Sequence, residues 1–350
     1  MYILTSPFTK TFDTLGLLYF VPDFLVSQIK EGIIVESPIG TKIENAIILK
    51  IIDNLEDFCN KNNVKISEDK IRSITGIVTE RQFISKENIL LAEFISDYYF
   101  TQIHNSINLF FPSIVRKKIL SLNEKFFERI NNNVGNENFH SLQNIELKLN
   151  LFSEKQKKAY LQIKNNFNIQ NTPSPLRERA GVRFNLLYGI TGSGKTEIYI
   201  KLILDNLENN KQSLLLIPEI ILNNQIGAKL IKIFGEDNII IINSSITPGK
   251  KAEYFADIYT GKSKIIIGTR SSLFFPYKNL GLIIMDEEHD NSYNSDKSPR
   301  YKTKEILQKK LELNPSLNIL LASGTPSINS MYKAVKGEWN LINLLEKYRK

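Results

Sequence analysis

The residues that most clearly could bind a ligand and take part in a reaction lie in the middle of the chain. They form the pattern G-x-x-x-x-G-K-T. In such a loop the glycines let the backbone wrap closely around phosphate groups, which the N–H groups at the following helix N-terminus attract. Lys195 can reach the β- and γ-phosphates of a nucleotide, and the hydroxyl of Thr196 can bind Mg²⁺. We therefore expect a nucleoside triphosphate site formed by Gly189, Gly192, Ser193, Gly194, Lys195 and Thr196.

The segments on either side of this pattern are those that a phosphate-binding loop requires. Residues 184–188 are a short, mostly apolar run that predicts a buried strand, and residues 197–207 carry apolar side chains at helical spacing. The alternative is a glycine-rich turn that only caps a helix. The strand before the loop and the helix after it favour phosphate binding.

A second group of residues that could take part in catalysis follows another apolar run, residues 280–285. Asp286 would stand at the end of that strand and hold Mg²⁺ directly or through water, and Glu287 would orient and deprotonate an attacking water. Two acidic residues alone could simply be solvated. Because these follow an apolar strand downstream of a phosphate-binding loop, they indicate a hydrolytic site in which Lys195, Asp286 and Glu287 are catalytic.

Most of the chain after residue 184 alternates apolar runs with helical patterns. The runs are residues 213–218, 238–243, 264–268, 280–286 and 318–323. Strands that are buried on both faces have such uninterrupted apolar sequences. We therefore expect an α/β fold with a central parallel sheet covered by helices.

The chain before residue 184 is of a different kind. Residues 1–112 contain two β-rich runs, 32–40 and 44–52, broken by Pro38 and Gly40, and predict a small β-rich domain such as a barrel. Residues 113–150 are basic and then asparagine-rich, which is typical of a linker. Ser153 and Gln156 predict a capping box at the start of the next helix. Residues 171–183 predict an exposed inserted loop.

The composition narrows the class of protein. The formal net charge of +8 favours a polyanionic partner. Cys59 is the only cysteine and the three histidines are scattered, so we expect neither a disulfide nor a zinc site in this chain. The N-terminus lacks the pattern of a secretory signal, and no stretch is long and apolar enough to span a membrane. We therefore expect a cytoplasmic protein with no membrane partner.

Several strings of residues together are typical of one family. They are Gly189-Ile-Thr-Gly-Ser-Gly-Lys-Thr-Glu-Ile-Tyr199, Leu216-Ile-Pro-Glu-Ile220, Ile267-Gly-Thr-Arg-Ser-Ser-Leu-Phe274, Leu280-Gly-Leu-Ile-Ile-Met-Asp-Glu-Glu-His-Asp-Asn-Ser-Tyr293 and Ser323-Gly-Thr-Pro-Ser327. In order and spacing they closely resemble the PriA-type replication-restart helicases, the primosomal protein N′ family of helicase superfamily 2. Residues 1–112 resemble, more loosely, the 3′-DNA-end-binding domain of that family.

The resemblance implies a RecA-like P-loop NTPase lobe over residues 151–345. It also implies an enzyme of replication restart and primosome assembly that unwinds DNA in the 3′→5′ direction with ATP and Mg²⁺. Gln156 would lie at the adenine. The implied partners are branched DNA, single-stranded DNA and 3′ ends, together with other primosome proteins and single-strand-binding proteins.

The resemblance also implies residues that contact DNA and that couple DNA to ATP. A pocket for a 3′ strand end would be lined by Phe12 and Asp13. Coupling would involve His289, Ser323 and Thr325. The other DNA contacts would come from Pro218, Glu219, Thr269, Arg270, Ser271 and Tyr293.

Differences from the family pattern limit what this chain is expected to do. Asn243-Ser-Ser stands where the family has a His-Ser pair, and the winged-helix domain is at most a vestige within residues 113–150. The chain stops at about the start of the family's second RecA-like lobe, so we expect that lobe, its arginine finger and the zinc domain to be absent. The chain alone would then be weakly active or inactive. The alternatives are a truncated module that binds DNA forks and nucleotide without catalysis, or another superfamily 2 DNA translocase.

Overall fold

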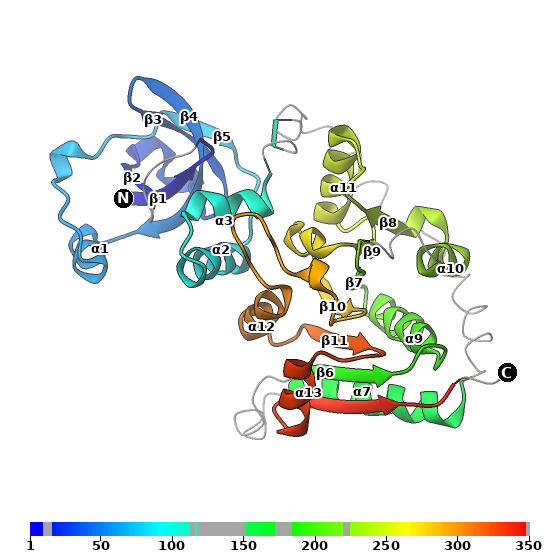
Figure 1. Cartoon of the computed structure of the whole chain (residues 1–350). Coiled ribbons are helices and arrows are strands. Elements are labelled where there is room, and N and C mark those ends of the chain that lie inside the picture. The colour runs from blue at the N-terminus through cyan, green and yellow to red at the C-terminus, as the bar shows by residue number, and fades with distance from the viewer. Residues whose placement is uncertain (10–15, 113–115, 118–151, 172–183, 220–224, 348–350) are drawn as a thin grey trace. The chain divides into compact units, whose positions relative to one another are not determined.

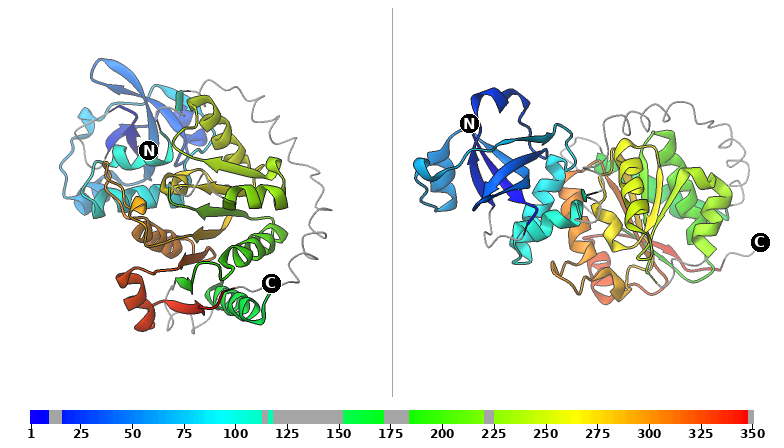
Figure 2. Two further views of the ribbon diagram at one scale, coloured as in Figure 1. Left: turned by 45° about the vertical axis from the view of Figure 1, so that its right-hand side comes forward. Right: turned by 90° about the horizontal axis from the view of Figure 1, so that it is seen from above.

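The computed structural model of the chain describes residues 1–9, 16–112, 116–117, 152–171, 184–219 and 225–347. Contacts between residues divide the chain into two compact units. The smaller unit comprises Met1–Lys117 and Asp296–Tyr301, and the larger unit comprises Lys118–Ser295 and Lys302–Lys350. Figure 1 and Figure 2 show the helices and strands of each unit.

The larger unit is built on a parallel sheet of seven strands in the order β12-β6-β11-β10-β7-β9-β8. The expected parallel sheet is therefore confirmed. One strand, β12, was not predicted, because it is an edge strand whose short apolar run is interrupted by asparagine. The strands are β6 (Asn185–Gly189), β7 (Gln212–Leu216), β8 (Ile239–Ile242), β9 (Ile265–Gly268), β10 (Leu280–Met285), β11 (Asn318–Ser323) and β12 (Asn340–Leu344).

Helices cover this sheet (Figure 2), and both faces of its inner strands are buried. Three helices, α7, α9 and α10, share one apolar core with Leu187, Leu215 and Leu282 of the strands. The neighbouring residues Leu186 and Leu214 point to the opposite face and are buried as well. The helices are α7 (Glu154–Asn171), α9 (Lys195–Glu208), α10 (Gln225–Phe234), α11 (Pro248–Thr260), α12 (Thr303–Leu313) and α13 (Ile328–Val335).

The start of α7 contains the capping box that the sequence predicts. The backbone N–H of Ser153 donates to Oε1 of Gln156 (2.9 Å), and the backbone N–H of Gln156 donates to Oγ of Ser153 (3.3 Å). Two N–H groups that a helix start leaves unpaired are thereby satisfied. The same bonds fix the position of Gln156, which is fully buried.

The smaller unit contains an antiparallel sheet in the order β2-β1-β4-β3-β5. The expected strand-turn-strand is the pair β3–β4, whose tight turn begins at Gly40 with a φ of +60°. Phe20 of one edge strand exchanges backbone hydrogen bonds with Arg72 and Ile74, just before the other edge strand, so the sheet closes on itself. The elements are β1 (Tyr2–Pro7), β2 (Leu17–Phe20), β3 (Ile34–Ile39), β4 (Lys42–Ile52), β5 (Gly76–Thr79), α1 (Leu55–Asn62), α2 (Lys86–Tyr98) and α3 (Ile103–Phe110).

Some expectations fall on residues outside the described ranges. These are the pocket residues Phe12 and Asp13, the linker over residues 113–150 apart from 116–117, and the inserted loop apart from residue 171. None of the described helices combines the length and the apolar composition needed to cross a bilayer.

Candidate functional site

Five of the segments that carry predicted site residues follow β6, β7, β9, β10 and β11. Because these strands are parallel, the five segments leave the sheet at one edge, where ligands bind in open α/β sheets. β6, β11 and β10 are consecutive in the sheet. The phosphate-binding loop, the segment after Ser323 and the acidic residues after Met285 are therefore neighbours.

The phosphate-binding loop has the backbone shape that its glycines allow. Gly192 and Gly194 have φ values of +79° and +88°, which other residues rarely adopt. Gly194 also precedes the first residue of α9, so the loop ends at a helix N-terminus. Oγ of Ser193 is buried and makes no hydrogen bond within the described part of the chain. A phosphate group would supply the missing partner.

Gln156 contacts this loop directly. Its Nε2 donates to the backbone oxygen of Gly194 (3.3 Å), while its Oε1 accepts from Ser153. The side chain thus ties the start of α7 to the phosphate-binding loop. The contact with adenine that the resemblance implies stays a prediction.

Lys195 and Glu287 face each other across the site. Nζ of Lys195 lies 3.7 Å from Oε1 of Glu287 and donates to the backbone oxygen of Gly189 (2.7 Å). Their side chains are 11% and 27% exposed, so water screens the pair only partly. Glu287 has a φ of +44°, a left-handed conformation that is unfavourable for residues other than glycine and that recurs at active sites. The phosphates of a nucleotide would compete with Glu287 for Lys195.

Asp286 is held by two donors on one oxygen. Its Oδ1 accepts hydrogen bonds from the hydroxyl of Tyr199 (2.7 Å) and from the backbone N–H of Glu287 (3.0 Å). Burial raises the pKa of the Asp286 carboxyl, and the hydrogen bond from Tyr199 opposes that shift. Burial and the charge of Asp286 raise the pKa of Tyr199 well above its ordinary value, so Tyr199 remains a donor.

The oxygen ligands at this edge suit Mg²⁺. They are the carboxylate of Asp286 and the hydroxyl of Thr196, and Mg²⁺ prefers few protein oxygens together with phosphates and water. Within the described ranges no group of three or more His, Cys, Asp or Glu side chains is arranged to hold a metal ion. The site therefore fits a metal that arrives with its nucleotide.

The three predicted coupling residues lie together. Nδ1 of His289 is 2.8 Å from Oγ of Ser323, and Nε2 of His289 is 3.4 Å from Oγ1 of Thr325. The backbone N–H of Thr325 also donates to Oγ of Ser323 (2.9 Å). Oε2 of Glu287 is 3.4 Å from Oγ of Ser323 and from the N atom of Gly324. The segment after β11 is thus bonded to Glu287 itself.

Tyr293 and Arg270 both bond to backbone oxygens of the larger unit, and contact of either residue with DNA stays a prediction. Tyr293 is buried, and its hydroxyl lies 2.6 Å from the backbone oxygen of Asp286 and 3.0 Å from that of Leu216. Nη1 of Arg270 donates to the backbone oxygens of Ser292 and, at 2.7 Å, Asn294. In this conformation Tyr293 offers no surface to a DNA strand, and Arg270 holds the segment on both sides of it.

The other four expected DNA contacts lie after adjacent strands. Pro218 and Glu219 follow β7, and Thr269 and Ser271 follow β9. Glu219 and Ser271 are exposed, Thr269 is half-buried and Pro218 is buried. Contact of these residues with DNA stays a prediction.

A buried polar network, which no sequence pattern predicted, joins the acidic segment after β10 to the start of α13. The carboxylate of Glu288 accepts hydrogen bonds from Ser327 N (2.7 Å), from Oγ of Ser330 (2.9 Å) and from Nζ of Lys304. Glu288 is 1% exposed. A run of acidic residues does not show which of them is buried, so Glu288 could not be singled out from the sequence.

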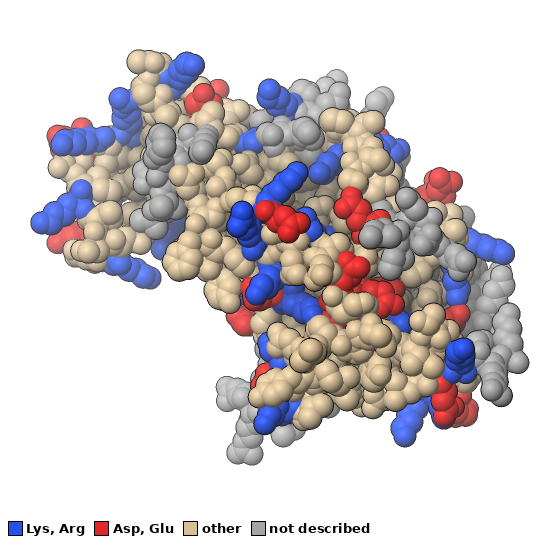
Figure 3. Space-filling model, viewed as in Figure 1, with Lys and Arg blue, Asp and Glu red and all other residues tan. Residues whose placement is uncertain are grey.

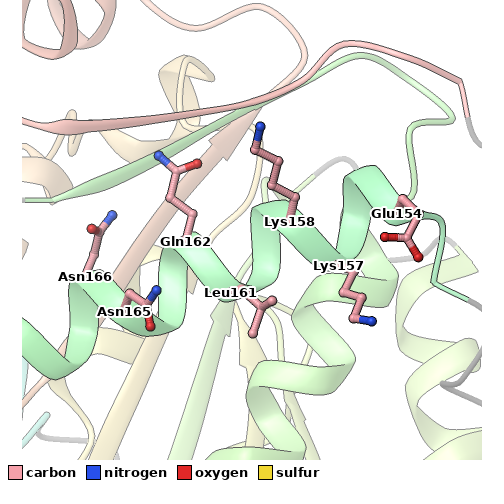
Figure 4. A pocket seen from close by; sticks show the side chains of 7 residues that line it. All are labelled: Glu154, Lys157, Lys158, Leu161, Gln162, Asn165 and Asn166. Atoms are coloured by element: carbon pink, nitrogen blue, oxygen red, sulfur yellow. The ribbon is translucent and has the colours of Figure 1, made fainter.

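A shallow hollow along α7 lies apart from these residues (Figure 4). All of its lining comes from one helix, and none of it belongs to the predicted site. The side chains that line it are Glu154, Lys157, Lys158, Leu161, Gln162, Asn165 and Asn166.

Charged side chains of both signs are interspersed over the face of the chain seen in Figure 3. The net charge of +8 therefore does not appear there as one large basic surface. A polyanion would be attracted by the electrostatic field of all the charges together and by local groups of lysines and arginines.

Comparison with known families gives two matches that divide the chain. The DEAD/DEAH box helicase family matches residues 153–334, which include the phosphate-binding loop and the acidic residues after β10. The 3′ DNA-binding domain (3′BD) family matches residues 3–112, which include the five strands of the smaller unit. The first match covers more than half of the 350 residues.

Curated relatives agree with these matches. Replication restart protein PriA of Rickettsia conorii is 32% identical over 343 residues, which are 98% of this chain and 45% of that protein. PriA of Helicobacter pylori is 36% identical over 258 residues, 74% of this chain and 35% of that protein. PriA of Bacillus subtilis is 38% identical over 159 residues, 45% of this chain and 20% of that protein.

The chain spans a little under half the length of the first of these relatives. The resemblance to PriA-type helicases is confirmed over the part that is present. The chain therefore belongs to the DEAD/DEAH box helicase family, and it corresponds to the N-terminal part of a PriA-type replication restart protein.

Proposed function

We propose that this chain provides the nucleotide site and a DNA-binding domain of an ATP-dependent DNA helicase of replication restart. The observation that carries the proposal is the meeting of Lys195, Asp286 and Glu287 beside the phosphate-binding loop. Those residues give the chemistry of nucleotide hydrolysis, and the match of residues 3–112 to a 3′ DNA-binding domain supports DNA as the partner.

The residues of the larger unit would handle ATP as follows. Backbone N–H groups of the loop and the N-terminus of α9 bind the phosphates, and Lys195 exchanges Glu287 for the γ-phosphate. Glu287, released from that ion pair, orients a water molecule and accepts its proton. Thr196 and Asp286 would hold Mg²⁺, which when bound would neutralise phosphate charge.

The smaller unit would hold a 3′ DNA end. The implied pocket residues Phe12 and Asp13 fall between β1 and β2, and the match to the 3′ DNA-binding domain supports this role. The finer parts of the proposal are unwinding in the 3′→5′ direction, binding of branched and single-stranded DNA, contact with primosome and single-strand-binding proteins, and a place in the cytoplasm.

A second candidate is a module that binds nucleotide and DNA without hydrolysing ATP at a useful rate. The contacts of Glu287 favour this candidate. The carboxylate of Glu287 pairs with Lys195 and lies 3.4 Å from Oγ of Ser323. A carboxylate with those partners must be freed before it can act as a base. Another superfamily 2 translocase is disfavoured by the similarity to PriA proteins over nearly the whole chain.

The test compares Lys195→Ala with a control lysine on the same helix. Loss of a charged hydrogen bond to phosphate should weaken binding of a fluorescent ATP analogue by roughly 10- to 100-fold. Lys201→Ala is the control, because Lys201 lies further along α9 and pairs with Asp205 at 3.0 Å. Equal affinities of both variants and the unmodified chain would refute the nucleotide site.

DNA-stimulated ATP hydrolysis separates the two candidates. Turnover that rises with a forked DNA and disappears in Glu287→Gln supports the enzyme. Nucleotide and fork binding with no such turnover supports the binding module.

A further inference from the structure

We propose that Tyr199 is a positioning residue for nucleotide-bound Mg²⁺, acting through the carboxylate of Asp286. The proposal rests on the nucleotide site proposed above. It adds a residue that belongs neither to the phosphate-binding loop nor to the acidic pair Asp286 and Glu287. Tyr199 would not touch the metal ion. Its hydroxyl would set the direction in which Asp286 presents its carboxylate.

The first support is the position of Tyr199 in α9. It comes one turn after Lys195, on the same face of the helix, and three residues after Thr196. The side chain is 1% exposed, and its hydroxyl ends 2.7 Å from Oδ1 of Asp286. A single helix therefore supplies the lysine for the phosphates, the hydroxyl for the metal, and the donor that orients the other metal ligand.

The second support is the distribution of hydrogen bonds on Asp286. Both of its described bonds go to Oδ1, from Tyr199 and from the backbone N–H of Glu287 at 3.0 Å. Two donors on one oxygen fix the rotation of the carboxylate, and they leave Oδ2 to serve Mg²⁺ or its water. Groups behind a ligand orient it in this way in many metal sites.

The third support is that a neutral donor keeps the charge that the metal needs. A lysine or arginine at position 199 would neutralise Asp286, whereas a hydroxyl orients it and leaves its negative charge. Asp286 is itself only 5% exposed, so water cannot replace the donor freely. Without the hydroxyl the carboxylate would keep one described donor and could turn.

The larger unit contains a matched control. The hydroxyl of Tyr160 also donates to a carboxylate, that of Asp205, which additionally pairs with Lys164 (3.2 Å) and Lys201 (3.0 Å). Asp205 is on α9 but outside the phosphate-binding loop and the acidic pair. Tyr160→Phe therefore removes the same group from the same kind of bond, outside the phosphate-binding loop and the Asp286–Glu287 pair.

The experiment measures metal binding in the full chain. Affinity for a fluorescent ATP analogue is titrated against Mg²⁺, and Mn²⁺ binding to the nucleotide complex is followed by electron paramagnetic resonance. We expect Tyr199→Phe to raise the Mg²⁺ concentration for half-maximal effect by about 10-fold, the lower end of what such supporting residues contribute. Affinity for the analogue in EDTA should be unchanged, and Tyr160→Phe should behave as the unmodified chain.

Metal dependence in Tyr199→Phe equal to that of the unmodified chain and of Tyr160→Phe would overturn the proposal. A second variant guards against misfolding: p-aminophenylalanine at position 199 keeps a donor on the ring and should restore the metal affinity. Weak metal binding in that variant, despite its donor, would also overturn the proposal. An unmodified chain that binds no ATP analogue would instead refute the proposed function.

Discussion

Two glycines of the phosphate-binding loop have similar backbone angles but different surroundings, so replacing each with alanine separates two physical effects. Gly192 and Gly194 have φ values of +79° and +88°, a region in which alanine costs roughly 1–2 kcal/mol. A Cβ atom on Gly192 would meet nothing within 4 Å. A Cβ atom on Gly194 would lie 2.0 Å from Nε2 of Gln156.

Gly194→Ala must therefore displace the side chain of Gln156. That side chain accepts the capping hydrogen bond from Ser153, worth about 1 kcal/mol, and donates one to Gly194 O, also worth about 1 kcal/mol. We expect Gly192→Ala to lower the free energy of unfolding of the larger unit by roughly 1–2 kcal/mol. Gly194→Ala should lower it by roughly 3–4 kcal/mol.

The assay uses the only tryptophan of the chain, Trp339, which lies in the larger unit. Trp339 is buried and packs edge-on against Phe184, with ring centroids 5.0 Å apart, so its fluorescence reports on this unit when urea unfolds it. Equal destabilisation by the two alanines would refute the reasoning. In a Gln156→Ala background the collision is gone, so a difference between the two alanines that persisted there would also contradict it.

Three further predictions concern charge and DNA. Asp286→Asn should stabilise the larger unit at neutral pH, because burial raises the pKa of the Asp286 carboxyl. The carboxyl contributes stability that is fully present below its unfolded pKa and is lost as the pH rises through its folded pKa. Urea midpoints of both proteins between about pH 4 and pH 8 test this. If the stability gained by Asp286→Asn did not grow with pH, the prediction would be contradicted. Lys304→Met removes the cation that pairs with the buried carboxylate of Glu288, and it should lower the free energy of unfolding by about 2 kcal/mol. The loss is smaller than for a fully buried pair, because the Lys304 side chain is 26% exposed. An unchanged urea midpoint would refute this prediction. If Phe12 and Asp13 line a pocket for a 3′ end, a DNA fork with a 3′-phosphate should bind more weakly in an anisotropy titration than one with a 3′-hydroxyl, and equal affinities would rule the pocket out.

The parts of the fold that the sequence predicts correctly are those set by local patterns. Continuous apolar runs such as residues 213–218 reflect burial on both faces, which only a covered parallel sheet provides. The capping box of Ser153 and Gln156 is local as well. The edge strand Asn340–Leu344 escaped prediction, because one side of it is less covered and its apolar run is broken by asparagine.

The parts of the site that could not be predicted depend on residues distant in the chain. Tyr199 and Asp286 are 87 positions apart, and Glu288 and Ser330 are 42 apart. Only the packing of the strands decides that these side chains meet. Arg270 shows the same limit. Its guanidinium group could bind phosphate as readily as the backbone oxygens of Ser292 and Asn294, to which it donates in the structure.

The strand order has a consequence for how the larger unit folds during synthesis. β6, which leads into the phosphate-binding loop, lies between β11 and β12, and Asn185 is 155 positions before its neighbour Asn340. At roughly 5–20 residues per second, a ribosome takes on the order of ten to thirty seconds to supply that partner. Until β11 has been made, β6 exists as an apolar segment with neither edge paired, and its second edge stays open until β12 follows. Unpaired apolar strands of this kind are the state in which nascent chains aggregate or recruit chaperones. The nucleotide site is thus among the first parts of the larger unit to be translated and among the last to form.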